Sequence, residues 1–276
     1  MATTTTNPAI QTSQPIQIRE VSKVYQAADS TPVHALDRIS LDVRPGEFVA
    51  IVGPSGCGKS TLLRIVAGLD NATGGQVLID GSVVNRPTAN AGFVFQAAVL
   101  LPWRSVLNNV TLPMVVKKKA GKEATERARG LLESFGLGGF ENKYPGELSG
   151  GMQQRVAIAR ALVSDPVLLL MDEPFGALDA LTREQLNVDL SRLTHESKKT
   201  TLFVTHSIAE AVLLADRVVV FGARPGRVLA DIRVPFEKPR TLAMSETPEF
   251  AALAARVRHV LTGGSDVIAS TTGVAS

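Results

Sequence analysis

The residues with the clearest chemical potential form a glycine-rich segment that ends in a lysine and a hydroxyl. The segment fits the pattern G-x-x-x-x-G-K-[ST] and reads Gly53-Pro54-Ser55-Gly56-Cys57-Gly58-Lys59-Ser60. Glycines let a backbone curl so that its N–H groups face phosphate oxygens, and we expect Lys59 to reach the β- and γ-phosphates and Ser60 to bind Mg²⁺. Thr61 is expected to add a phosphate contact. The segment therefore predicts a nucleoside triphosphate site, and the alternative is a glycine-rich turn with a chance lysine.

Two adjacent carboxylates, Asp172 and Glu173, directly follow the apolar run Val167–Met171. A strand that ends there places both at the carboxyl edge of a sheet, where ligands of α/β folds bind. Asp172 suits Mg²⁺ coordination, and Glu173 suits orienting and deprotonating an attacking water. Taken alone, such a pair often only leads a strand into a polar loop, but the phosphate pattern upstream favours the chemical interpretation.

A second anion site is predicted where a serine and two glycines, Ser149-Gly150-Gly151, precede a helical pattern. The first N–H groups of a helix have no intrahelical partner and the helix dipole is positive there, so a helix start attracts phosphate. The alternative is an ordinary serine N-cap.

The elements that must position these residues follow from the hydrophobic runs. Phe48–Val52 is a continuous apolar run that ends at glycine, as a buried strand does, and a helix is expected from near Gly58 to near Gly68. Later apolar runs at 167–171, 202–205 and 218–221 are separated by helical stretches, which predicts a largely parallel sheet covered by helices. The fold class is therefore α/β.

Between these strands the pattern changes to helices. Residues 123–135 are rich in Ala, Glu, Arg and Leu, and apolar residues recur at helical spacing from Met152 to Val163. We predict a helical insert at about 97–164 within a core at 15–235, a disordered tail at 1–14 and a C-terminal extension at 236–276. From Pro235 on, the chain carries two more prolines and one amphipathic stretch.

Composition narrows the classes of partner and compartment. Lys and Arg number 29 against 26 Asp and Glu, a net charge of +3 without a clustered basic patch, so no nucleic-acid partner is expected. Cys57 is the only cysteine, which predicts a reducing, intracellular compartment. We interpret its side chain as a small space-filler rather than a nucleophile, because no histidine base lies nearby in sequence. The apolar runs are shorter than the roughly 20 residues that span a bilayer, so a membrane connection requires a partner.

With these motifs in order, residues 16–235 resemble the nucleotide-binding subunits of ABC transporters. The resemblance implies a P-loop NTPase core with a mostly parallel sheet, an antiparallel β part and an inserted helical subdomain. It implies ATP and Mg²⁺ as cofactors and ATP hydrolysis as the activity. Met152 stands where many members have Gln, a departure from the family's pattern at that position.

Individual roles are implied by the same resemblance. Tyr25 is expected to stack on adenine, and Gln96 to contact the metal and link the γ-phosphate region to the helical insert. His206 is similar to the switch histidine that touches the γ-phosphate, so it joins Glu173 and Gln96 as a catalytic residue. Without the resemblance, Tyr25 would be interpreted as an aromatic residue at the edge of a sheet, and Gln96 and His206 as polar residues at strand ends.

The resemblance also implies a head-to-tail dimer of two copies of this chain. Residues Ser149–Gly151 of one copy would close on the nucleotide held by Gly53–Thr61 of the other. Ala177-Leu178-Asp179 would lie across the dimer seam, with Asp179 near the nucleotide.

A run of apolar residues and the only tryptophan follow Gln96, in the segment Leu101-Pro102-Trp103-Arg104. This segment and residues 222–227 resemble the importer group for nitrate, sulfonates and taurine, which implies uptake of a small anionic or sulfur- or nitrogen-containing solute. The implied partners are transmembrane permease subunits and, indirectly, a solute-binding protein, with the chain peripheral at the cytoplasmic face of the plasma membrane. Trp103 is interpreted as part of a socket for a permease helix, and the alternative is a core aromatic.

Two other classes of function are weighed as alternatives. Non-transport ABC-type mechanoenzymes share the motifs, but those of DNA repair and chromosome organisation usually carry a long coiled-coil or zinc-hook insertion, and those of translation usually carry two motor units. This chain has a short insert and no Cys-x-x-Cys. A plain P-loop kinase would leave residues 148–155 unexplained.

Overall fold

The computed structural model describes residues 14–26, 30–176 and 178–263. Within these residues the larger sheet has six strands, and the five neighbours from β9 to β6 pair in parallel. β10 pairs antiparallel with β9 at one edge, so the prediction of a mostly parallel sheet is confirmed. Their order is β10 (Val228–Arg233), β9 (Arg217–Phe221), β3 (Phe48–Val52), β8 (Thr200–Thr205), β7 (Leu168–Asp172) and β6 (Ala91–Val94).

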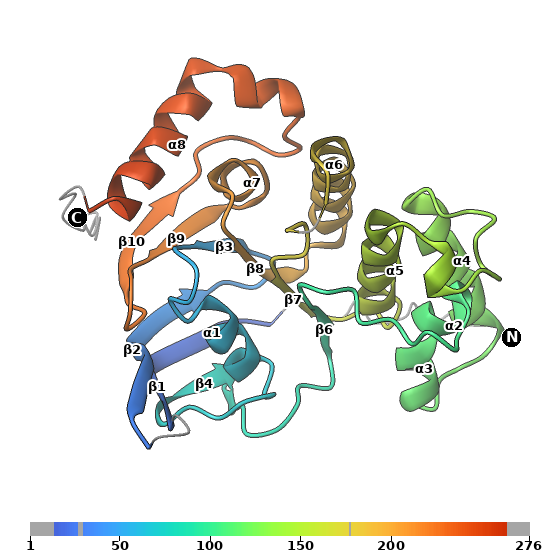
Figure 1. Ribbon diagram of the computed structural model, residues 1–276, viewed down its shortest axis with the longest axis horizontal. Coiled ribbons are helices and arrows are strands. Elements are labelled where there is room, and N and C mark those ends of the chain that lie inside the picture. The colour runs from blue at the N-terminus through green and yellow to red at the C-terminus, as the bar shows by residue number, and fades with distance from the viewer. Residues whose placement is uncertain (1–13, 27–29, 177, 264–276) are drawn as a thin grey trace, which may run out of the picture.

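A smaller antiparallel sheet is the antiparallel part that the resemblance implies. Across the described ranges its strand order is β2 (Pro32–Val43), β1 (Ile16–Gln26), β4 (Gly74–Ile79) and β5 (Ser82–Val83). Helix α1 (Lys59–Val66) lies between the two sheets (Figure 1). The apolar residues of α1 therefore pack in the hydrophobic core between the two sheets.

Strand β3 divides its side chains between two hydrophobic cores. Val49 and Ile51 pack with α1 and the smaller sheet, whereas Phe48, Ala50 and Val52 pack with the helices on the other face. Successive side chains of a strand point to opposite faces, so a strand covered on both faces is a continuous apolar run. This is the physical reason for the uninterrupted run that marks β3 in the sequence.

The helical part lies beyond β6, at the right of Figure 1. Its helices are α2 (Val106–Val110), α3 (Leu112–Val116), α4 (Lys122–Ser134) and α5 (Gly150–Leu162), with a short 3₁₀ turn at Pro145–Glu147. In α4 the buried residues Ala124, Ala128 and Leu132 are four positions apart, which places them on one face of the helix.

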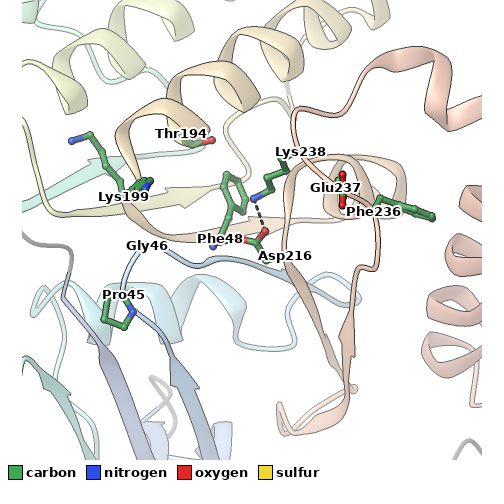
Figure 2. A pocket seen from close by; sticks show the side chains of 10 residues that line it. Pro45, Gly46, Phe48, Thr194, Lys199, Asp216, Phe236, Glu237 and Lys238 are labelled. Atoms are coloured by element: carbon green, nitrogen blue, oxygen red, sulfur yellow. Dashed lines mark hydrogen bonds and ion pairs between the residues drawn. The ribbon is translucent and has the colours of Figure 1, made fainter.

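Three further helices cover the sheet on the face opposite α1: α6 (Ala180–Ser197), α7 (Ile208–Leu214) and α8 (Pro248–Leu261), the last preceded by a 3₁₀ turn at Leu242–Glu246. The segment that leads to α8 is fixed by two cations. Arg240 is 4% exposed and donates hydrogen bonds to the carbonyls of Val212, Leu213 and Ala215, which cap the carboxyl end of α7. Lys238 Nζ lies 2.7 Å from an Asp216 oxygen (Figure 2).

The predicted domain boundaries are not tested by these elements. Residues 1–13 of the predicted tail and 264–276 of the predicted extension lie outside the described residues. The Gln14 carbonyl accepts a hydrogen bond from Thr200 Oγ1 at 2.9 Å. Helices α2 to α5 fall between residues 106 and 162, inside the stretch predicted for the helical insert, and the boundaries themselves stay predictions. Among the described helices, none combines the length and apolar character needed to span a bilayer.

Candidate active site

The glycine-rich loop at residues 53–58 connects the carboxyl end of β3 to the start of α1. Gly58 has a φ of 91°, a left-handed conformation that glycine adopts without steric cost. A Cβ added there would lie 2.6 Å from the Ala35 carbonyl oxygen, so a larger residue would displace the neighbouring strand. Pro54, Ser55 and Gly56 are exposed. The exposed part of the loop therefore precedes a helix N-terminus, the arrangement that binds phosphates.

The Lys59 ammonium lies inside the curl of this loop. The residue is 4% exposed, and its Nζ donates to the carbonyl oxygens of Gly53 at 2.7 Å and Pro54 at 3.0 Å. Nζ also lies 4.0 Å from Glu173 Oε1. A buried ammonium requires hydrogen-bond or charge partners, and these three oxygens supply them while holding the cation beside the carboxylates that end β7.

Ser60 and Asp172 join the first turn of α1 to the end of β7. The Ser60 hydroxyl donates to Asp172 Oδ1 at 2.7 Å. Burial raises the pKa of the Asp172 carboxyl, and the Ser60 hydrogen bond opposes that rise. Hydroxyl and carboxylate oxygens are the hard ligands that Mg²⁺ prefers, and it usually takes one or two carboxylates together with phosphate oxygens. The donor set of this pair therefore fits the metal ion that the sequence predicts here.

Glu173 is the point where side chains from three other segments converge. Its backbone has a φ of 43°, uncommon outside glycine, and its N–H donates to the Val204 carbonyl at 2.9 Å. One carboxylate oxygen, Oε2, lies 3.2 Å from His206 Nδ1 and 3.5 Å from Gln96 Nε2. Lys59, Gln96 and His206 thus surround the Glu173 carboxylate. This is the arrangement expected of a general base held in place by orienting groups.

Tyr25 lies near the end of β1 with its ring orientation fixed by two charged residues. Its hydroxyl donates to Asp70 Oδ2 at 2.7 Å, and Lys23 Nζ, bonded to Asp70 Oδ1 at 2.6 Å, lies 4.7 Å from the ring centroid. Burial and the hydrogen bond to Asp70 raise the pKa of the Tyr25 phenol. The side chain is 37% exposed, so a fixed and accessible aromatic ring is present, as stacking against a base requires.

The predicted second anion site lies at the start of α5, where Ser149 and Gly150 are exposed. Ser149 Oγ accepts the Met152 N–H at 3.3 Å, so this serine is an N-cap whatever else it does. In Figure 1, α5 lies beyond β6, across the sheet from α1. The fold therefore does not bring Ser149, Gly150 and Gly151 of one chain onto the phosphate loop of the same chain.

Asp179 caps the neighbouring helix α6 in the same way. Its Oδ1 accepts the Thr182 N–H at 3.0 Å, and a Cβ added at Gly151 would lie 2.8 Å from Thr182 Cγ2. The starts of α5 and α6 are thus neighbours, and only a glycine fits at position 151 without a shift. Ala177, predicted for the same seam, lies outside the described residues.

Cys57 turns away from the exposed side of the loop. It is 1% exposed and belongs to the core between the two sheets. Burial raises the pKa of its thiol, which disfavours the reactive thiolate. Its side chain therefore fills space, as interpreted from the sequence.

Three charged residues near the site were not assigned to it from the sequence. Lys23 and Asp70 orient Tyr25, and Arg224 Nε donates to the Gly56 carbonyl at 3.2 Å from the turn between β9 and β10. Arg224 belongs to the segment 222–227, noted above only for its resemblance to an importer group. The signal that would have found it is a cation in a glycine- and proline-rich turn after a core strand, at the sheet edge where ligands bind.

Known proteins show the same chain organisation. A family model described as ABC transporter matches residues 36–176, just over half of the chain. The aliphatic sulfonates import ATP-binding protein of Bacillus cereus is 45% identical over 226 residues, which is 82% of this chain and 88% of that protein. The taurine import ATP-binding protein of Rhizobium johnstonii is 43% identical over 257 residues, 91% of this chain and 98% of that protein.

One similar solved structure is the dimeric post-hydrolysis state of an ATP-binding cassette bound to ADP and Pi. It has a TM-score of 0.73 and 37% identity to this chain, and the match covers 80% of this chain and 100% of that chain. The expected P-loop NTPase fold is thereby confirmed. On the family match and these relatives, the chain belongs to the ABC transporter family, as an ATP-binding subunit that hydrolyses ATP.

Proposed function

We propose that this chain is the ATPase of an ABC importer and that it powers uptake of a small sulfonate-type solute through a separate permease. The observation that carries the proposal is the convergence of Lys59, Gln96 and His206 on Glu173. Such a cluster at the carboxyl edge of the sheet suits hydrolysis of a bound nucleoside triphosphate. Import, rather than export, is supported by the likeness to proteins named for import of aliphatic sulfonates and of taurine.

In this proposal the loop N–H groups and Lys59 hold the β- and γ-phosphates. Ser60 and Asp172 would hold Mg²⁺, which when bound neutralises charge on the phosphates. Glu173 accepts a proton from the attacking water while the water oxygen bonds to the γ-phosphorus and the bond to the bridging oxygen of ADP breaks. The Glu173 carboxylate is kept in place by His206, whose Nδ1 lies 3.2 Å from it.

Gln96 gives a route from the nucleotide to the helical insert. Its neighbour Phe95 accepts a hydrogen bond on its carbonyl from Gln154 of α5 at 3.2 Å. Arg160 of the same helix donates to the carbonyls of Ala98 and Val99. The chain is therefore bonded to α5 on both sides of Gln96, through Gln154 before it and Arg160 after it, so a displacement of Gln96 on ATP hydrolysis would move the helix with it.

We propose that two copies pair head to tail, with Ser149–Gly151 of one closing on the phosphate loop of the other. Two observations support this. The two sites are separated within one chain (Figure 1), and the similar cassette with ADP and Pi is dimeric. ATP then joins the two copies, and hydrolysis releases them.

An apolar surface for the permease follows Gln96 along the chain. Val99, Trp103 and Val116 are 60%, 72% and 73% exposed, so the alternative that Trp103 is a core aromatic is wrong. Val99 and Val116 also line a cavity of about 600 Å³ whose other lining residues are largely apolar. Exposed apolar patches of this kind mark partner surfaces, and we assign this one to a helix of a transmembrane permease subunit.

This assignment places the chain as a peripheral protein at the cytoplasmic face of the plasma membrane, with a solute-binding protein delivering the solute to the permease. The test is ATP hydrolysis by the purified complex with its permease and binding protein, measured with taurine, an alkanesulfonate and nitrate in turn. Stimulation by a sulfonate is expected, and none in the matched Glu173→Gln complex. Stimulation by nitrate alone would overturn the solute class, and stimulation by none of the three would overturn the sulfonate assignment.

The permease surface has its own test in Trp103→Ala. Truncating a buried interface aromatic costs about 2 kcal/mol or more of binding, so co-purification with the permease is expected to fall while ATP binding by the isolated subunit is retained. Because Trp103 is exposed, the thermal melt of the isolated subunit should hardly change. A fall in the free energy of unfolding by the roughly 3–5 kcal/mol typical of truncated core aromatics would contradict the assignment.

A further inference from the structure

A buried network brackets His206 on both sides along the chain. The Thr205 hydroxyl donates to Glu210 Oε2 at 2.6 Å and accepts the Ser207 N–H at 3.0 Å. The Ser207 hydroxyl accepts the Glu210 N–H at 3.3 Å. Both neighbours of His206 are thus tied to the first turn of α7, and the direction of the imidazole toward Glu173 depends on where Glu210 is held.

Glu210 faces a cation from a different helix. Its side chain is 7% exposed, and Oε1 lies 3.6 Å from Nε of Arg183 on α6. Burial raises the pKa of the Glu210 carboxyl, and the Thr205 hydrogen bond and the Arg183 charge oppose that rise. Within the described residues, Arg183 Nε is a buried nitrogen without a hydrogen-bond partner. The two groups therefore attract each other across a gap that is wider than a hydrogen bond.

The other end of the Arg183 guanidinium is attached to the turn before α6. Its Nη2 donates to the Leu178 carbonyl at 3.2 Å, and the Arg183 N–H donates to the Asp179 carbonyl at 3.0 Å. This turn belongs to the segment that the family resemblance places across the dimer seam. A single side chain thus contacts both the seam and the carboxylate that holds His206.

We propose that Arg183 and Glu210 are positioning residues that couple the Leu178–Asp179 turn to the placement of His206 against Glu173. The inference rests on the proposed roles of that turn at the dimer seam and of His206 in hydrolysis. A shift of the turn by roughly 1 Å would bring Arg183 Nε to the distance of about 2.8 Å at which a charge-assisted hydrogen bond forms. Closure of the dimer would then fix Glu210, Thr205 and the histidine between them.

The experiment uses ATP hydrolysis by the full-length protein, measured at steady state and in a single turnover. Glu210→Gln keeps the shape of the side chain and removes its charge, and Arg183→Met removes the guanidinium. We expect kcat to fall at least about tenfold, and KM for ATP to stay within about twofold, because a misplacement of about 1 Å costs up to about 10²-fold in rate. The matched controls Glu184→Gln and Arg192→Met, at exposed positions of α6, should keep the wild-type kcat.

Arg183→Lys separates an effect on the rate from a loss of folding. It keeps a charge opposite Glu210 but cannot reach Leu178 with the same geometry, so we expect a wild-type thermal melt with a lowered kcat. A wild-type kcat in Arg183→Lys, Arg183→Met and Glu210→Gln would overturn the proposal.

A role through His206 differs from a merely structural role in one measurable way. In a His206→Ala background, Glu210→Gln should cause no further loss of rate, because the group it positions is already gone. An equal fold-loss in both backgrounds would overturn the proposal. If His206→Ala lowers the rate and Glu210→Gln does not, only this inference fails; if His206→Ala leaves the rate unchanged, the proposed catalytic role of His206 fails with it.

Discussion

The two edges of the six-stranded sheet hold their charged residues in different ways. At the carboxyl edge, Lys59 donates to carbonyls of its own loop and lies 4.0 Å from Glu173, which His206 also approaches. At the amino edge, Asp216 is bonded to the Phe48 N–H at 2.8 Å and to Lys238 at 2.7 Å. One edge gathers several groups around one carboxylate, and the other joins charges in close pairs.

The presence of a cavity does not by itself identify the edge at which the chemistry occurs. The amino edge has a cavity of about 600 Å³, lined by Phe48, Asp216 and Lys238 among others (Figure 2). Its lysines at 199 and 238 are paired with Asp165 and Asp216 at 2.7 Å each. These pairs fasten neighbouring segments to the sheet, whereas ligands of open α/β sheets bind at the carboxyl ends of strands. We therefore assign chemistry to the carboxyl edge and stability to the amino edge.

The largest effect that tests this division between the two edges is expected on kcat, in the variant Glu173→Gln. General-base catalysis contributes about 10²–10⁴-fold, so kcat should fall by that factor while MgATP binding stays normal. The control is Glu237→Gln, an exposed carboxylate that lines the amino-edge cavity, which should hydrolyse ATP at the wild-type rate. Near-normal hydrolysis by Glu173→Gln would move the role of base elsewhere, with His206 the next candidate.

The second effect is on stability and concerns Arg240. Arg240→Met removes the cation that caps the carboxyl end of α7, where three carbonyls accept its hydrogen bonds. Hydrogen bonds to charged groups contribute about 1.5–3 kcal/mol each at most, so we expect urea unfolding to show a loss of about 2–4 kcal/mol, with kcat retained at low temperature. Arg258→Met, at an exposed position of α8, is the control. A fall in kcat without a loss of stability would break the division between the edges.

The third effect is on nucleotide affinity. Arg224→Met removes a hydrogen bond to the Gly56 carbonyl in the phosphate loop, and a hydrogen bond is worth about 1 kcal/mol. We expect KM for ATP to rise about fivefold with kcat unchanged. The control is Arg227→Met. Arg227 lies in the same turn as Arg224 and is paired with Asp37 of β2, so its loss should leave KM near the wild-type value. An unchanged KM in Arg224→Met would remove this residue from the site.

The smallest effect is expected at the Lys238–Asp216 pair of the amino edge. The side chains of Lys238 and Asp216 are 16% and 39% exposed. Solvent therefore reaches the Asp216 carboxylate, and ion pairs open to solvent contribute about 0–1 kcal/mol. Lys238→Met should therefore lower the free energy of unfolding by less than about 1 kcal/mol and leave ATP hydrolysis unchanged. A marked loss of hydrolysis would mean that the amino edge takes part in the reaction.

The two edges also differ in how far the sequence predicts them. β3 spans Phe48–Val52 as predicted, because a strand buried on both faces leaves a continuous apolar run, and the phosphate loop follows it directly. Tyr25, Gln96 and His206 could be proposed only through the resemblance to a family. Their importance comes from contacts between strands far apart in sequence, which periodicity does not encode.

The segment at the amino edge was harder to predict because its contacts are made by tertiary packing. Arg240 reads as one more surface cation in a proline-containing stretch, and its partners are carbonyls at the end of α7, some 25 residues away. The same reason hid Glu210 and Arg183, whose meeting depends on how α6 and α7 lie beside each other. Local patterns predict where an element lies, but not which of its polar residues find a buried partner.

Closure of two chains around ATP is tested most directly by the molar mass of Glu173→Gln in light scattering, with and without MgATP. We predict one chain without nucleotide and twice that mass with MgATP, because the variant binds ATP and cannot release the dimer by hydrolysis. Adding Ser149→Arg to the same variant should keep the single-chain mass while ATP still binds. A mass that does not depend on MgATP, or a dimer that persists with Ser149→Arg, would contradict a site completed by Ser149–Gly151 of a second copy.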